Sequence, residues 1–321
     1  MYQDEFILGF QAQLTDHLSA GVRGVYRELK RAIDDTCDYS PIVEWAVANG
    51  YDEGDVHPGN ASFPYCRLYN PGSDGVWNID VDGNGTIENV RIAADQLGPK
   101  AKRSYSALEF FWEGAWDRFF LQGSYTYAKS KGNSEGGVKS DIGQADTGTT
   151  QDFDYPQLML GSFGYLPNDR RHTLKLFGNW EITDEWSVGG NLLVQSGRPE
   201  NCFGIYGNDP VNYRVAYFSC DAGEPTSGRD NGTTIVERGT VGRTPWTTTF
   251  DLNVAYRPAF ADGKLAFKVD VFNVFNSDKA TSVDEEGEDD LGSPAGARNT
   301  YLTPLSWQTP RSVRFMVQYD F

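Results

Sequence analysis

The residues best suited to chemistry lie in one short stretch, DVDGNGTIE, at residues 80–88. It places oxygen atoms at alternate positions of a calcium-binding loop, through Asp80, Asp82, Asn84, Thr86 (main-chain carbonyl) and Glu88. Calcium takes several oxygen ligands at about 2.3–2.6 Å, and Gly85 allows the tight turn that gathers them. Arg91 stands where a complete EF-hand has its last glutamate, and no helical pair is expected beside the loop. The stretch predicts a loop that binds Ca²⁺, and an Asp/Gly/Asn-rich hairpin tip is the alternative.

Four cysteines are the second set of reactive side chains: Cys37, Cys66, Cys202 and Cys220. None belongs to a C-x-x-C pair, which disfavours a zinc or thioredoxin-like site. An even number within Gly/Asn/Asp-rich segments favours two disulfides in an oxidising compartment, with four free thiols as the alternative.

Catalysis and nucleic-acid binding are not predicted. The three histidines, His17, His57 and His172, fall in a turn, a loop and the start of a strand, with no nucleophile motif nearby. The net charge of −17 disfavours nucleic-acid binding, which requires a basic face on the protein. The acidic run DEEGEDD (284–290) is typical of a solvated loop, and capture of a cation or a basic ligand is the alternative. We therefore expect neither an enzyme nor a nucleic-acid-binding protein.

The elements that position these residues are strands with one apolar and one polar face. The last ten residues, SVRFMVQYDF, place Val313, Phe315, Val317, Tyr319 and Phe321 at every second position. This two-residue period is typical of a β-strand. Nine such runs are expected, at 6–14, 18–26, 105–114, 118–130, 172–182, 186–196, 247–258, 264–276 and 312–321.

The connections between the expected strands alternate between short and long. Turns within pairs have a few residues, whereas about 70, 40, 45 and 35 residues separate the pairs, which is unusual in a compact domain. Short turns at one rim and long loops at the other indicate an antiparallel transmembrane β-barrel with long extracellular loops. No stretch approaches the ~20 apolar residues of a spanning helix. One short helix is expected in the first loop, with Ser40 as its cap and Gly50 after its end.

The barrel interpretation also predicts how the cysteines pair. Cys37 and Cys66 fall in one long extracellular loop, and Cys202 and Cys220 fall in another. We therefore expect the disulfides Cys37–Cys66 and Cys202–Cys220.

Several segments in a fixed order resemble TonB-dependent outer-membrane receptors, and the Oar-like group among them. They are ALEFFWEGAWDRFFLQGSYTYAKSKGNSEG, NDRRHTLKLFGNW, LLVQSGRPE, KVDVFNVFN and the terminal aromatic residue. The resemblance implies a barrel of about 22 strands plugged by an N-terminal domain. It also implies a bacterial outer-membrane location and energised uptake of a scarce nutrient, such as an iron chelate, cobalamin, a glycan or a peptide. The chain, residues 1–321, would then be the C-terminal part of such a barrel, about nine strands, without its plug domain and signal peptide.

The same resemblance implies partners. Outer-membrane lipid and lipopolysaccharide would surround the barrel, and TonB would act through a missing N-terminal region. The barrel-assembly machinery would read the terminal alternation as its signal, through Val313, Phe315, Val317, Tyr319 and Phe321. Two other functions stay open: a calcium-binding surface or adhesive outer-membrane protein, and a secreted soluble β-rich calcium-binding domain.

Overall fold

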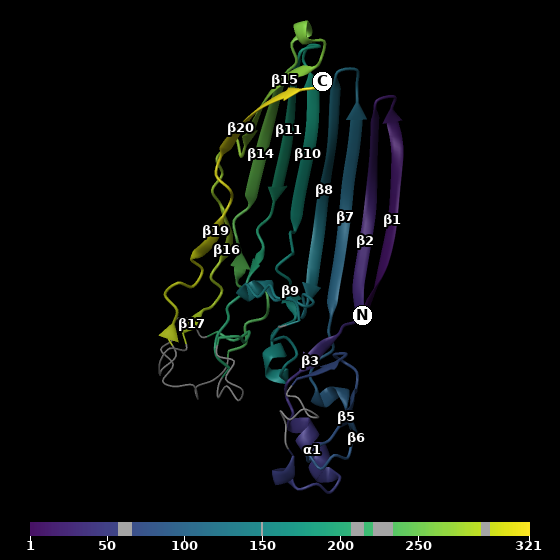
Figure 1. The fold of residues 1–321 in the computed structure, drawn as a ribbon, viewed down its shortest axis with the longest axis vertical. Coiled ribbons are helices and arrows are strands. Elements are labelled where there is room, and N and C mark those ends of the chain that lie inside the picture. Colours follow the sequence, from purple (N-terminus) through teal and green to yellow (C-terminus); the bar gives the residue numbers. More distant parts are fainter. Residues whose placement is uncertain (57–65, 149, 207–214, 221–233, 290–295) are drawn as a thin grey trace.

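Nine long antiparallel strands form one sheet in the computed structural model of the chain, which describes residues 1–56, 66–148, 150–206, 215–220, 234–289 and 296–321. Each strand is hydrogen-bonded to the next in chain order, from β1 at one edge to β20 at the other (Figure 1). The nine strands are β1 (Tyr2–Thr15), β2 (Leu18–Arg31), β7 (Arg103–Ala115), β8 (Phe119–Gly132), β10 (His172–Glu181), β11 (Trp186–Gln195), β14 (Thr247–Tyr256), β15 (Leu265–Phe272) and β20 (Ser312–Tyr319). The prediction of nine strands in this order is confirmed.

The strand register places the apolar side chains on one face of the sheet. Val22 lies opposite Phe10 on one side and Phe110 on the other. Leu192 in turn lies between Leu176 and Phe250. Since neighbouring strands are in register and side chains alternate, this apolar face continues across the sheet.

Polar side chains occupy the opposite face and pair across the strands. Arg23 Nε donates to Glu109 at 2.8 Å, between β2 and β7. Arg314 Nε donates to Asp270 at 2.8 Å, between β20 and β15, and Lys268 donates to Gln318 at 2.8 Å. Polar and charged side chains of neighbouring strands are therefore paired on this face.

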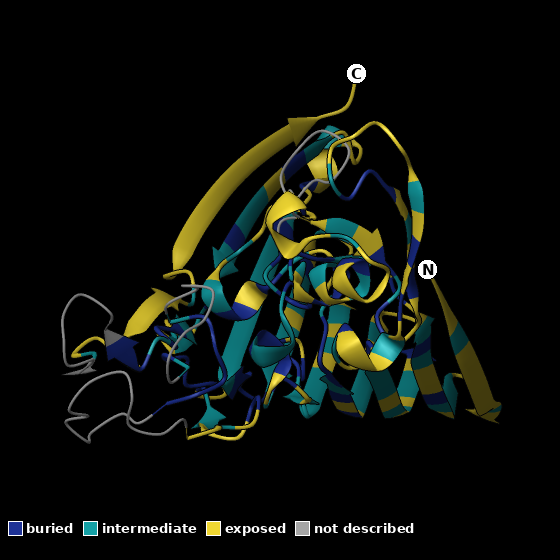
Figure 2. Ribbon diagram, turned by 90° about the horizontal axis from the view of Figure 1, so that it is seen from below, coloured by how far each residue is buried: buried dark blue, intermediate teal, exposed yellow. Residues whose placement is uncertain are grey.

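The polar face is the inner one. The strands lie along an arc when the molecule is viewed from its loop end (Figure 2). The connection after β8 folds over the polar face, where Asp169 and Arg170 line a cavity together with Thr126 and Lys175. The apolar face is consequently outside, where a transmembrane barrel meets lipid.

Aromatic rings gather near both ends of the outer face. At the short-turn end, Trp186 stacks on Tyr256 at 4.5 Å between ring centroids, and Trp116 stacks on Phe119 at 5.5 Å. At the loop end, His172 stacks on Trp246 at 5.5 Å. Two aromatic girdles of this kind mark the interfaces of a membrane barrel.

The two edges of the sheet do not pair with each other. In the part of the chain that the structure describes, β1 pairs with β2 alone and β20 with β15 alone. Leu8 is 84% exposed and Phe315 78% exposed, so both edge strands present bare apolar side chains. The sheet is thus an open portion of a barrel, and an edge in lipid requires further strands, because unpaired backbone groups there cost several kcal/mol each.

All four long connections lie at one end of the sheet and the short turns at the other (Figure 1). The connection between β2 and β7 forms a lobe with a core that includes Ile42, Ala46, Ile79, Val90 and Ile92. Its elements are β3 (Asp34–Thr36), α1 (Ser40–Ala48), η1 (Glu53–Asp55), β4 (Arg67–Tyr69), β5 (Gly75–Ile79), β6 (Glu88–Ile92) and η2 (Ala94–Gln96). We call residues 32–102 the first-loop lobe.

The other connections contain only short elements. They are η3 (Ser140–Ile142), η4 (Pro156–Met159), β9 (Gly164–Tyr165), β12 (Pro199–Glu200), β13 (Gly242–Arg243), η5 (Ala259–Ala261), β16 (Ala280–Val283), β17 (Glu288–Asp289), β18 (Gly296–Ala297) and β19 (Pro304–Trp307). Strand β9 pairs with the end of β8, and β12–β13, β16–β19 and β17–β18 are separate antiparallel pairs. None of the helices in the described ranges combines the length and the apolar character that a membrane span requires.

The predicted helix of the first-loop lobe is present, but its start was placed wrongly. Ser40 is the first helical residue of α1 rather than its cap, and Tyr39 occupies the cap position without a side-chain hydrogen bond. Asp38 accepts the Ser40 N–H instead, at 3.0 Å. The end is as expected, since Gly50 has a φ of 92° just beyond the helix.

Candidate functional site: the loops and the inner face

A network of buried ion pairs holds the loops together at the loop end of the sheet. Arg238, from the β11–β14 connection, is fully buried and pairs with Asp141 and, at 2.8 Å, with Glu135. Both carboxylates belong to the β8–β10 connection, so these pairs join segments about 100 residues apart in sequence. Burial raises the pKa of Glu135, with the neighbouring Asp141 as the next cause.

A second buried pair lies beside the first. The ammonium of Lys139 is 3.1 Å from Asp152, and both side chains are completely inaccessible to solvent. The rings of Phe203 and Phe218 flank the ammonium at 5.4 and 5.2 Å from their centroids. Lys139 and Asp152 both belong to the β8–β10 connection, whereas the rings come from the β11–β14 connection, so the contact of the rings with the ammonium joins two loops.

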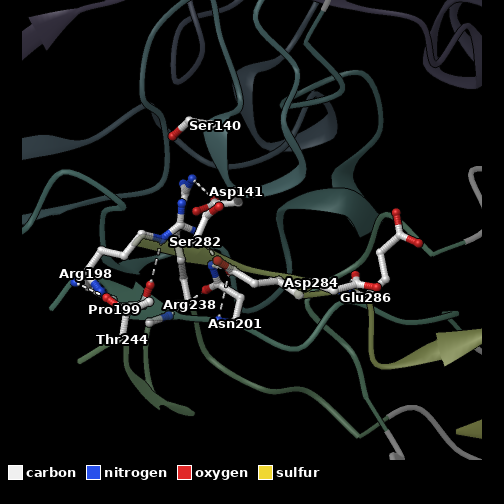
Figure 3. Close-up of polar contacts among 12 residues, drawn as sticks. Ser140, Asp141, Arg198, Pro199, Asn201, Arg238, Thr244, Ser282, Asp284 and Glu286 are labelled. Atoms are coloured by element: carbon white, nitrogen blue, oxygen red, sulfur yellow. Dashed lines mark hydrogen bonds and ion pairs between the residues drawn. The ribbon is translucent and has the colours of Figure 1, made fainter. Parts of the chain in front are cut away.

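A third pair brings in the β15–β20 connection. Glu285 binds Arg198 through one carboxylate oxygen, and through the other it accepts from the main chain and side chain of Asn201, at 3.0 and 2.6 Å. Asn201 Oδ1 in turn accepts the Gly239 N–H at 2.7 Å. Figure 3 shows Asn201 with Arg198 and Arg238 at the centre of these contacts. The three loops therefore form one cross-linked layer.

A small cavity of about 180 Å³ opens within this layer. Its lining residues come from the β8–β10, β11–β14 and β15–β20 connections and are mostly polar. They include Asp141, Arg198, Ser282, Asp284 and Glu285 (Figure 3). Its carboxylates are already paired with Arg198, Arg238 and Arg298, so the cavity is suited to small polar molecules rather than to an ion.

A larger cavity of about 300 Å³ lies on the inner face, where the strands meet the loops. Its two carboxylates are already paired: Glu109 with Arg23, and Asp169 with Arg243 and, at 3.6 Å, Arg171. Its lining also includes strand and loop residues such as Ser124, Thr126, Asn168, Arg170, Thr173, Lys175 and Gln195.

Two positive groups of this inner cavity lack a carboxylate partner. Arg170 Nη1 is buried without a hydrogen-bond partner among the described residues, and the structure gives no ion pair to Lys175 within the same ranges. Burial, followed by the charges of Arg198 and Arg243, lowers the pKa of Arg170. The inner cavity thus carries positive charge that is available to a ligand.

The predicted calcium loop is the connection between β5 and β6. Its main chain folds back on its own side chains, with Asp80 accepting the Gly85 N–H at 2.9 Å and Asn84 accepting the Thr86 N–H at 2.7 Å. Glu88 accepts the Val81 N–H at 3.2 Å through one carboxylate oxygen.

The expected convergence of the loop's carboxylates is not present. Among the described Asp, Glu, His and Cys residues, one trio brings ligand atoms within 4.8 Å of one another: Asp35, Cys37 and Cys66. Asp82, which bonds to Asn84, and Glu88, which also accepts from Tyr51 Oη at 3.0 Å, are held by protein groups instead. The hydrogen bond to Glu88, followed by burial, raises the pKa of Tyr51.

Both predicted disulfides are present. Cys37 is bonded to Cys66 in the first-loop lobe, and Cys202 to Cys220 in the β11–β14 connection. Among the described residues no cysteine is free.

The acidic run after β15 was wrongly expected to be a solvated loop. Asp284 is 9% exposed and Glu285 3% exposed, because Arg198 and Arg298 pair with this segment. Asp290, the last residue of the run, lies outside the described residues. Sequence reasoning missed this cluster and the inner cavity, because their partners come from distant loops.

The remaining predicted positions lie on the outer surface. The residues of the proposed assembly signal are all exposed: Val313, Phe315, Val317, Tyr319 and Phe321. His172 lies at the loop rim, 2.7 Å from Tyr125 Oη, and His17 lies in the β1–β2 turn with Nδ1 3.1 Å from the Ala115 carbonyl. His57 lies outside the described residues.

The sequence of the chain is similar to that of a known outer-membrane transporter. The TonB-dependent transporter Oar of Myxococcus xanthus is 29% identical over 243 residues, which are 64% of this chain and 21% of that transporter. No protein-family model matches the chain.

Solved structures similar to the chain include two outer-membrane proteins. The transporter YddB of Escherichia coli is 14% identical, and the match covers 99% of this chain and 32% of that chain with a TM-score of 0.49. The ferripyoverdine receptor of Pseudomonas aeruginosa is also 14% identical, and the match covers 99% of this chain and 27% of that chain with a TM-score of 0.46. The sequence match and the two-faced sheet lead to one conclusion. The chain is related to the Oar-like TonB-dependent transporters, forms an open portion of an antiparallel transmembrane β-barrel, and belongs to the bacterial outer membrane.

Proposed function

We propose that the chain forms the C-terminal strands of a plugged outer-membrane barrel that takes up a scarce nutrient with energy delivered by TonB. The observation that carries this proposal is the inner face of the sheet, which is polar, has paired charges, and opens into a cavity beneath the loops. A purely structural barrel wall would not need a cavity with unneutralised charge at its loop end. The sequence relation to Oar supports the same function, over the 21% of that transporter that is matched.

The proposed whole barrel needs partners that the chain's surfaces fit. The outer apolar face and its aromatic girdles fit lipid and lipopolysaccharide. The exposed alternation along β20, which ends in the aromatic residues Tyr319 and Phe321, fits recognition by the barrel-assembly machinery. TonB would act through a plug domain elsewhere in the whole protein.

The inner cavity suggests the chemical class of the nutrient. Arg170 offers a partly buried guanidinium whose Nη1 has no hydrogen-bond partner in the described part of the chain, and Lys175 adds a second positive charge. Charge-assisted bonds from a guanidinium favour a carboxylate or a phosphate. We therefore infer that the nutrient, or the chelate that carries it, presents an anionic group to these two residues.

Uptake by cells that carry the whole gene tests the proposal. A deletion strain is complemented with wild type, with Arg170→Gln combined with Lys175→Gln, or with Lys264→Gln at the opposite rim as a matched control. Growth on limiting ferric chelates, cobalamin, oligosaccharides or peptides identifies the nutrient, and its labelled form measures uptake. We expect uptake to require both the gene and TonB, to fall at least tenfold in the double variant, and to be unchanged in the control.

Two results would contradict the proposal. If deleting the gene leaves the uptake of every tested nutrient unchanged, the proposed transport is refuted. Uptake that depends on TonB but is equal in the double variant and the wild type would refute the anionic ligand and leave transport supported.

A further inference from the structure

The hairpin loop of the first-loop lobe contains a buried carboxylate oxygen that no described part of the chain satisfies. Asp80 is only 6% exposed, and its Oδ1 is buried without a hydrogen-bond partner among the residues that the structure describes. Its other oxygen accepts the Gly85 N–H, which directs the carboxylate into the loop. A buried, unpartnered carboxylate oxygen is costly unless an opposite charge or a donor meets it.

The core of the lobe fixes the position of this carboxylate. Ile79 and Val81, the neighbours of Asp80 in the chain, are both fully buried. Asp80 therefore cannot turn out to solvent without pulling two core side chains with it. Gly83 and Gly85, with φ of 75° and 90°, allow the rest of the loop to curve back over it.

Other residues of the same loop offer oxygen ligands, although in the present conformation they do not converge on Asp80. Asp82, Asn84 and Glu88 offer side-chain oxygens, and Thr86 offers its carbonyl. Within the described ranges, neither Asp80, Asp82 nor Glu88 takes part in an ion pair with a basic side chain. The nearest basic residue in the hairpin, Arg91, is engaged instead by Asp74 at 2.6 Å. The negative charge of the loop is thus not neutralised by the hairpin itself.

We propose that this loop is a calcium-binding site, with Asp80 Oδ1 as its fixed ligand and Asp82, Asn84, Thr86 and Glu88 closing around the ion. Five protein oxygens, completed by water, reach the six to eight that Ca²⁺ takes, and a flexible set of this kind disfavours the smaller, strictly octahedral Mg²⁺. Asp82 and Glu88 would exchange their present hydrogen bonds for the ion. Since Arg91 replaces the bidentate glutamate, we expect the affinity of extracellular modules, with Kd about 10⁻⁴–10⁻³ M. This site does not depend on the transport function proposed above.

Calorimetry on the whole protein, purified in detergent and freed of lipopolysaccharide, is the first test. Wild type, Asp80→Asn, Asp82→Asn and the control Asp95→Asn are titrated with CaCl₂ and with MgCl₂. Asp95 is an exposed carboxylate of the same lobe and lies in η2, outside the loop. We expect one calcium per chain, a weaker response to magnesium, at least tenfold weaker calcium binding in both loop variants, and no change in the control.

Terbium luminescence gives a second readout that places the ion. Tyr51, which donates to Glu88, lies close enough to sensitise a lanthanide in the loop. We expect luminescence that calcium displaces, that falls in Tyr51→Phe, and that is lost in Asp80→Asn. Resistance of the first-loop lobe to proteolysis, equal in each variant to that of the wild type, shows that the lobe is still folded.

The proposal is overturned if the wild type gives no calcium-dependent heat. It is equally overturned if a folded Asp80→Asn variant binds calcium or terbium as the wild type does, because the ion would then lie elsewhere on the protein.

Discussion

The buried pair of Lys139 and Asp152 gives the sharpest test of how the loop layer is held together. Both side chains are completely buried, and Asp152 is the carboxylate paired with the ammonium. In Asp152→Asn the ammonium would remain buried without its counter-charge. Breaking a buried pair in this way costs about 3–5 kcal/mol. The rings of Phe203 and Phe218 contact Lys139 in both proteins, so they do not offset this loss.

That cost should appear as easier opening of the loops. At about 1.4 kcal/mol for each factor of ten, 3–5 kcal/mol raises the open fraction by about one hundredfold to several thousandfold. When opening and closing are fast, the rate of proteolysis follows the open fraction. We therefore expect subtilisin to cleave the loops of purified Asp152→Asn at least about a hundred times faster than those of the wild type.

Two further variants separate charge from packing. Asp184→Asn breaks the pair with Arg118, in which Asp184 is 90% exposed, and should change cleavage by less than about fivefold, since exposed pairs contribute about 0–1 kcal/mol. The double variant Lys139→Met with Asp152→Leu removes both charges and should recover most of the resistance. The reasoning is refuted if Asp152→Asn resists like the wild type, or if the double variant is as sensitive as the single one.

Three other predictions concern the two faces of the sheet, the disulfide of the first-loop lobe and the buried carboxyl of Asp34. Leu192→Arg places a charge on the lipid face and should cost about 2–4 kcal/mol, so less protein should show the heat-modifiable band of a folded barrel, whereas Asn191→Arg on the inner face should be tolerated. Replacing Cys37 and Cys66 by serine opens a link across 29 residues and should destabilise the first-loop lobe by about 3–4 kcal/mol, measured by its proteolysis. Burial raises the pKa of Asp34 to about 8, whereas the unfolded carboxyl ionises near pH ~4. The contribution of this proton to the stability of the lobe is therefore full below pH ~4 and is lost as the pH rises to about 8. The lobe should open more readily at pH ~8.5 than at pH ~5, and Asp34→Asn should remove this dependence.

The sheet could be predicted from the sequence because its signal is local and repeated. Alternation along each strand assigns Leu192 and Phe250 to one face and Asn191 to the other, whatever the distant residues are. Alternating short and long connections then assign the two rims. The short strands inside the loops gave no such signal, since two to five residues are too few to establish a period. The start of α1 was misplaced by one residue because Asp38, rather than Ser40, accepts the hydrogen bond at the helix start.

The loop layer could not be predicted, because its charges are stabilised by partners far away in the sequence. Arg238 is 97 residues from Asp141, and Arg198 is 87 residues from Glu285. A run of acidic residues, considered without its partners, is predicted to be exposed to solvent, since each charge loses hydration on burial. Glu285 is buried nevertheless, because Arg198 and Asn201 together replace the water around both of its oxygens.

The same reasoning distinguishes Asp80 from the other buried carboxylates of the loops. Asp141 and Glu285 are met by guanidinium groups from another loop, and Asp152 by an ammonium from its own loop. Asp80 is as deeply buried as Asp141, both at 6% exposure, yet no such cation from the described residues meets it. Asp82 and Glu88 of the same loop add further negative charge. A cation supplied from solution would balance this carboxylate without unfolding the hairpin, and the sequence of the loop matches the ligand spacing of calcium at its first five ligand positions.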